Sequence, residues 1–185
     1  NGIVYLVDAG GLKGGYDTET LEDLARLAMK HKVNTVLVEG NFGDGMYLQL
    51  FEPVLKRIYP VHLEEYTVSG QKEARMLDKL EPVVQGHRMV VSRSLIEKDA
   101  EDGLGRDYRL FYQFTHLTRD RGALKHDDRL DALAEAVGYW TESFDRDTVS
   151  AEDEHKEKLR EARLKQFMER VGRMKGRRRD RYAGW

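Results

Sequence analysis

The stretch Thr35-Val36-Leu37-Val38-Glu39-Gly40 joins a short apolar run to an acidic residue. Its β-branched and aliphatic residues predict a buried strand that ends at Glu39. Open α/β sheets place their sites at the carboxyl ends of strands, and a glycine-rich loop over residues 40–45 follows here. Glu39 is therefore a candidate functional residue. The alternative is a strand-end glutamate that is turned to solvent.

Helical and strand patterns alternate on both sides of this stretch. A helix is predicted over about 19–31, with Asp17 or Thr18 as its cap. A second stripe runs from Leu48 to Ile58 and contains Pro53, so this helix either starts late or kinks. The remaining pattern predicts strands over 3–7, 61–68 and 89–91, helices over 71–86, 107–121 and 127–143, and a loop over 97–107. This alternation predicts an α/β fold with a mixed sheet flanked by helices.

Charge divides the 185-residue chain into two parts. The net charge is −2, but residues 151–185 hold 12 basic and 7 acidic side chains and carry +5. The predicted division is a domain over 1–145 and a charged helical or disordered tail over 146–185. The lack of cysteine excludes disulfides and thiolate metal sites. Without an apolar run of about 20 residues or a signal peptide, the expected protein is soluble and intracellular, with no membrane partner.

The first two residues, Asn1-Gly2, are a dipeptide typical of a tight β-hairpin turn. A hairpin needs a strand on each side of its turn, and the pattern has only the strand that follows. The dipeptide therefore predicts that the first strands of the sheet lie outside this chain. A flexible start to an ordinary first strand is the alternative.

The densest acidic pattern is His126-Asp127-Asp128-Arg129-Leu130-Asp131-Ala132-Leu133-Ala134. On a helix, Asp128, Asp131 and Glu135 share one face, while the leucines anchor the other face to the core. The alternative to a functional role is that Asp127 only caps the helix and that the other acids are ordinary first-turn residues. Together with Glu39, these carboxylates are hard oxygen ligands suited to two Mg²⁺ or Mn²⁺ ions, which can promote phosphodiester hydrolysis.

Four motifs follow one another along the chain: Val38-Glu39-Gly-Asn-Phe-Gly-Asp-Gly45, Val68-Ser-Gly-Gln-Lys-Glu-Ala-Arg-Met76, Leu110-Phe-Tyr-Gln113 and His126–Ala134. In this order they resemble the nuclease domain of the large terminase subunit of short-tailed bacteriophages. The resemblance covers residues 1–145. It implies an RNase H-like fold and a metal-dependent endonuclease that cuts concatemeric double-stranded DNA during genome packaging.

The resemblance also implies a ligand set. Glu39 matches the second ligand of the family, and the Asp127-Asp128 pair matches the third, of which Asp128 is favoured. Asp131 is then an auxiliary group, so that Glu39, Asp128 and Asp131 are the expected catalytic residues. The first-strand aspartate of the family has no match, and Asp8 is expected to be a peripheral acid.

The expected partners follow from the same resemblance: double-stranded DNA, the portal or procapsid, and the small terminase subunit, in the host cytoplasm. The packaging ATPase has no counterpart, because no phosphate-binding G-x-x-x-x-G-K-[ST] loop is present. The basic tail could tether DNA, dock on the portal, or form a solvated amphipathic helix.

Candidate DNA contacts lie near the acidic motifs. Ser69 and Lys72 precede or begin a predicted helix and could grip a phosphate, although Ser69 as a simple helix cap is equally compatible. Four basic side chains could follow the DNA backbone or be solvated surface groups: Arg75, Arg119, Arg121 and Lys125. His126, beside the acids, could orient a water or a phosphate, or be a polar residue before a helix cap.

Two further functions remain open. A Holliday-junction resolvase is one, because that RNase H-like family also carries D-x-x-D-A-L-A on its last helix. The other is a DNA- or portal-binding fragment whose catalytic site is incomplete.

Overall fold

The computed structural model describes residues 2–40 and 45–142. Residues 2–139 form one compact unit. The tail predicted over 146–185 lies outside the described residues, as does Asn1 of the predicted hairpin turn. Within the described ranges, none of the helices combines the length and the apolar character needed to cross a lipid bilayer.

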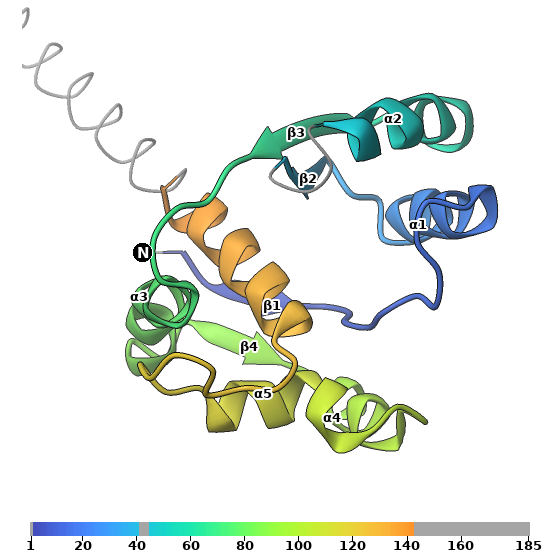
Figure 1. Cartoon of the computed structure of the whole chain (residues 1–185). Helices are drawn as coiled ribbons and strands as arrows, with labels where there is room; N and C mark the ends of the chain where they lie inside the picture. Colours follow the sequence, from blue (N-terminus) through green and yellow to red (C-terminus); the bar gives the residue numbers. More distant parts are fainter. Residues whose placement is uncertain (1, 41–44, 143–185) are drawn as a thin grey trace, which may run out of the picture. The chain divides into compact units, whose positions relative to one another are not determined.

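One half of the unit is built around a parallel pair of strands, β2 (Thr35–Glu39) and β3 (His62–Tyr66). Two helices, α1 (Thr18–Lys30) and α2 (Met46–Ile58), bury their apolar faces against this pair (Figure 1). The shared core comprises Leu21, Ala25, Ala28, Phe51 and Leu55, with Val36, Val38 and Leu63 of the strands packed on it. Because side chains alternate along a strand, Glu39, Glu64 and Tyr66 face away from α1 and α2.

The other half is built around a second parallel pair, β1 (Val4–Leu6) and β4 (Met89–Val91). It also contains α3 (Lys72–Gln85), α4 (Arg93–Glu101), the 3₁₀ turn η1 (Arg106–Tyr108), α5 (Leu110–His116) and a helix over residues 128–142. The last of these, called here the 128–142 helix, is the orange helix of Figure 1.

The 128–142 helix contacts both strand pairs. Its apolar side, including Leu130, Leu133 and Val137, packs with α3 residues and with Val4, Leu6 and Met89 of β1 and β4. At its other end, the Tyr139 hydroxyl donates a 3.0 Å hydrogen bond to Glu64 of β3. The acidic side of this helix is therefore held near the face of β2–β3 that α1 and α2 leave open.

The α/β class with flanking helices is confirmed, and the described strands form two separate parallel pairs. Asp17 caps α1 by accepting a hydrogen bond from the Thr20 amide at 2.9 Å. Of the two predicted caps, Asp17 and Thr18, the first is therefore confirmed. Helix α2 begins at Met46, so Pro53 lies inside the helix and the late start is wrong.

Two sequence expectations between residues 93 and 121 are wrong. The predicted loop over 97–107 is confined to residues 102–105, because α4 begins after a Ser92 cap and continues to Glu101, and η1 begins at Arg106. The helix predicted over 107–121 is much shorter, since α5 spans only Leu110–His116. The acidic and glycine-rich composition of the first segment suggested a loop. Its contacts with distant residues explain why part of it is ordered as helix.

Those contacts centre on Asp99, which is 5% exposed. Its carboxylate accepts the Leu110 and Phe111 amides at 3.0 and 2.9 Å, so it caps α5 from a separate helix. Arg129 donates to Asp99 at 3.0 Å and pairs with Asp102 at 2.6 Å. The buried Gln113 side chain in turn accepts the Leu130 amide at 3.0 Å. These bonds fix the start of the 128–142 helix, where the acidic motif lies.

We predict that Asp99→Ala lowers the free energy of unfolding by about 3 kcal/mol, because it leaves two amides and the Arg129 charge without their buried partner. Urea unfolding followed by circular dichroism measures this loss. Glu97→Ala on the same helix removes only an exposed pair with Arg93 and should cost less than about 0.5 kcal/mol. Equal losses in the two variants would contradict the role given to Asp99.

Candidate functional site

Tyr66, at the end of β3, marks the place where the predicted acidic residues converge. It is paired in register with Glu39 of β2, and the two side chains lie on the same face of the strands. Burial raises the pKa of Tyr66, and the charges of Glu39, Glu135 and Asp131 raise it further, to about 12. Three carboxylates, one from β2 and two from the 128–142 helix, therefore act on one half-buried hydroxyl.

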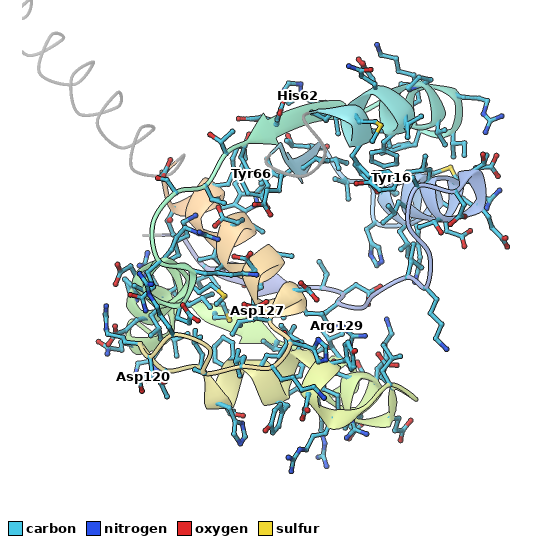
Figure 2. All side chains as sticks on the ribbon, in the orientation of Figure 1. Tyr16, His62, Tyr66, Asp120, Asp127 and Arg129 are labelled. Carbon is cyan, nitrogen blue, oxygen red and sulfur yellow. The ribbon has the colours of Figure 1, made fainter. Side chains whose placement is uncertain are left out.

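A ladder of ion pairs joins α3 to the 128–142 helix beside Tyr66. Lys72 Nζ lies 2.8 Å from Asp127 Oδ1 and 3.2 Å from Asp131 Oδ2. Arg75 donates to both Asp131 and Glu135 at 2.9 Å, and Lys79 also pairs with Glu135. We call these six residues the α3 ladder: Lys72, Arg75, Lys79, Asp127, Asp131 and Glu135. Figure 2 shows Asp127 at the start of the 128–142 helix, where the ladder begins.

The spacing of the charges explains the ladder. Lys72, Arg75 and Lys79 recur every three or four residues and so lie on one side of α3. The three acids recur every four residues on the facing helix. Gly138 leaves room for the Lys79 side chain, which pairs with Glu135, because a Cβ at position 138 would lie 2.9 Å from Cδ of Lys79. The two helices therefore approach each other along matched rows of opposite charge.

The ladder keeps Lys72 and Arg75 charged. Burial alone would lower the pKa of Lys72, but the hydrogen bond that Lys72 donates to Asp127 and the charge of Asp131 outweigh this effect and raise that pKa. Arg75 has a raised pKa for the same reasons, with Asp131 and Glu135 opposing the effect of burial. Asp131 and Glu135 are each only 8% exposed, so their charges are compensated from within the protein.

The predicted metal ligands do not form a finished coordination site. Among the described residues, no group of three or more histidine, aspartate or glutamate side chains is arranged to hold a metal ion. Asp127 and Asp131 instead direct oxygens at Lys72 and Arg75. Asp128 is exposed in the first turn of the 128–142 helix, and Glu39 is half-buried. The donor set nevertheless consists of carboxylate oxygens, which suit Mg²⁺ or Mn²⁺.

The predicted DNA contacts are distributed around this site. Ser69 and Lys125 are exposed, and Lys72 and Arg75 belong to the α3 ladder. The residue that caps α3 is Gln71, so the alternative role of Ser69 as its cap is wrong. The His126 ring stacks on Tyr108 with 3.8 Å between ring centroids. Arg119 pairs with Asp78 and Glu81 on the surface of α3.

Tyr66 and Lys79 are the members of the site that sequence reasoning missed. The alternation of His62, Glu64 and Tyr66 along β3 was visible in the sequence and placed Tyr66 on a polar face. Nothing local showed that this face meets the acidic side of a helix some 65 residues away in the sequence. Lys79 follows Lys72 and Arg75 at helical spacing, which could have suggested a basic row.

Asp8 belongs to a different charged group. It pairs with Lys98 at 2.5 Å and with His31 at 2.9 Å, and these interactions hold its pKa below its usual range. A cleft of about 890 Å³ lies here, lined among others by Asp8, His31, Lys98 and Arg129. None of the predicted metal ligands lines this cleft.

The convergence on Tyr66 can be tested by titration. We predict that Tyr66 ionises near pH 12 and that Glu39→Gln moves its pKa toward the ordinary value of 10, because one nearby negative charge is lost. The raised pKa favours the neutral phenol in the folded protein. Its contribution to stability is therefore full below pH 10 and is lost as the pH rises from 10 toward 12.

Tyrosine ¹³Cζ chemical shifts measured against pH follow this ionisation, and Tyr66→Phe assigns the signal. Glu65→Gln is the matched control, because Glu65 is the neighbour of Tyr66 on β3 but alternates to the opposite face. A Tyr66 pKa that is unchanged by Glu39→Gln, or changed equally by Glu65→Gln, contradicts the arrangement.

Comparison with known proteins agrees with the resemblance carried by the four motifs. Residues 1–89 match the family model described as the ribonuclease H-like domain of the bacteriophage T7 terminase. Over 175 residues, the chain is 43% identical to the terminase large subunit of Enterobacteria phage T3, an alignment that covers 91% of this chain and 29% of that protein. The chain thus corresponds to less than a third of this relative. These matches show that the chain is similar to the RNase H-like nuclease domain of phage large terminase subunits.

Proposed function

We propose that this chain is the nuclease module of a DNA-packaging terminase, a metal-dependent endonuclease that cuts concatemeric double-stranded DNA. The observation that carries the proposal is the convergence of Glu39, Asp131 and Glu135 on Tyr66. Carboxylates from separate elements gather in one place at a high electrostatic cost, which a divalent cation can offset. The relative's name, a terminase large subunit, supplies the packaging context.

Glu39, Asp128 and Asp131 are the residues that would hold Mg²⁺ or Mn²⁺, with Asp127 as the other candidate ligand from the acidic motif. Their oxygens fit such ions by chemical type, and the burial of Asp131 restricts its mobility. Two bound ions would lower the pKa of an attacking water and stabilise the negative charge on the leaving 3′ oxygen.

Other residues of the site orient these carboxylates. Arg75 bonds to Asp131 and Glu135 through different nitrogens of one planar group, which fixes the position of Asp131. Tyr66 stays protonated at neutral pH and keeps its hydroxyl as a donor among acceptors. The buried bonds of Asp99, Arg129 and Gln113 hold the start of the helix that carries Asp128 and Asp131.

Phosphate contacts are proposed for the exposed Ser69 and Lys125 and for the half-buried His126. The segment before the 128–142 helix is tied to α3, because Gln71 donates to the Arg119 carbonyl at 2.7 Å and Glu73 accepts the Gly122 amide at 2.6 Å. These ties bring two stretches with candidate DNA contacts to the same end of α3. The basic tail, outside the described residues, would add attraction to DNA that does not depend on sequence.

The remaining parts of the proposal depend on the resemblance to the large terminase subunits. A large terminase subunit would act in the host cytoplasm with the portal or procapsid and the small subunit. The packaging ATPase would reside in a part of the protein that this chain does not include.

We predict that manganese-dependent cleavage of supercoiled plasmid falls at least about 100-fold in Glu39→Ala and in Asp131→Ala, because each removes a ligand on which the charge of the transition state depends. The assay should use both the 185-residue chain and a longer polypeptide that continues upstream in the encoding genome. The resemblance places one metal ligand there.

Glu52→Ala is the control, since Glu52 forms only an exposed pair with Lys56 on α2. Undiminished cutting by both site variants would refute the nuclease assignment. Cleavage by the longer polypeptide but not by the 185-residue chain would show that the chain alone is an incomplete module. Preference for four-way junctions over linear duplex would favour a resolvase instead.

A further inference from the structure

The inference concerns Lys72, whose ammonium group lies between two of the candidate metal ligands. We propose that Lys72 is an exchangeable counter-ion: it neutralises Asp127 and Asp131 in the metal-free protein, is displaced by a divalent cation, and then binds a DNA phosphate. The inference rests on the proposed function, because it assumes that these carboxylates take part in binding metal.

The contacts of Lys72 support the first step. Its Nζ lies 2.8 Å from Asp127 Oδ1 and 3.2 Å from Asp131 Oδ2, so one ammonium bridges two carboxylates. A cation placed between these oxygens must compete with that ammonium. A divalent ion carries twice the charge of the ammonium and so competes effectively for the same oxygens.

The ladder contains three basic residues, and Lys72 is the one suited to leave. Its side chain is 37% exposed, against 15% for Arg75 and 25% for Lys79. Arg75 is anchored at two acids by a rigid planar group, whereas a lysine ammonium sits on a flexible stem. Displacement of Lys72 therefore leaves the ion pairs of Arg75 and Lys79 in the α3 ladder in place.

The position of Lys72 supports the second step. It is the first residue of α3 and follows an exposed turn that contains Ser69 and Gly70. Phosphates are attracted to helix N-termini, and a lysine at this point can reach outward without moving the helix. Metal loading and DNA contact would then be coupled, since the ammonium is free for phosphate only after an ion has taken its place.

The proposal predicts two properties of Lys72→Met. Its affinity for Mn²⁺, measured by isothermal titration calorimetry on the whole chain, should be about three- to tenfold higher than that of the wild type, because the competing ammonium is absent. Its DNA affinity should also depend less on salt once Mn²⁺ is bound. The plot of log K against log[salt] should be shallower than for the wild type by about 0.9, the value for one lost phosphate contact.

Without metal, the salt slopes of wild type and Lys72→Met should coincide, because Lys72 is then engaged with Asp127 and Asp131. Fluorescence anisotropy with a short duplex gives the slopes, and a gel after each titration shows that the duplex is intact. Lys79→Met is the matched control: it removes the same charge from the same helix, but at a rung away from Asp127, and should keep the wild-type salt slope. Lys72→Arg keeps a cation and should retain the metal-dependent slope.

The outcomes separate the two proposals. Absence of Mn²⁺ binding by the wild-type chain and by the longer polypeptide would refute the metal site itself. If Mn²⁺ binds, but Lys72→Met has the affinity and salt slopes of the wild type, only the exchange is refuted. A salt slope reduced equally with and without metal would show that Lys72 contacts DNA permanently, which also overturns the exchange. Circular dichroism verifies that each variant is folded.

Discussion

The ion-pair ladder between α3 and the 128–142 helix is the interaction on which the candidate site depends. Two acids that are almost fully buried, Asp131 and Glu135, need positive partners because an unpaired buried charge costs several kcal/mol. Arg75 supplies a partner to both of them. The apolar side of the same helix is held in the core through Leu130 and Val137. The orientation in which the apolar side meets the core and the acids meet α3 also brings Asp131 and Glu135 near Tyr66.

The ladder also explains how so many acids can lie together in a folded protein. Carboxylates that lie close together repel one another, and the chain compensates them with cations from a neighbouring helix. In the proposed exchange, the half-buried lysine at the end of the row gives way to a divalent cation, while Arg75 stays in place. The two cations thus have different roles. Arg75 fixes the positions of Asp131 and Glu135. Lys72 neutralises Asp127 and Asp131 at the end of the row.

Agreement between sequence and structure is best where local patterns decide. The apolar run at Thr35–Val38 forms β2, Asp17 caps α1, and helix α3 ends before Gly86 as its pattern predicts. The disagreements lie where distant partners decide. Residues 97–107 look like a loop in composition, but Asp99 is buried against Arg129 and the amides of α5, which orders α4. A local pattern carries no information about a partner that lies 30 residues away.

Local sequence patterns predict the alternation of strands and helices, the acidic face of the 128–142 helix and the position of Glu39 at a strand end. Each depends on periodicity or neighbouring residues, which are properties of the chain alone. The folded structure adds that Glu39 and Asp131 both act on Tyr66, and that Lys72 bridges Asp127 and Asp131. Those contacts join residues that are 27 to 65 positions apart in the chain. The energy of a charge depends on which opposite charges the packing brings near.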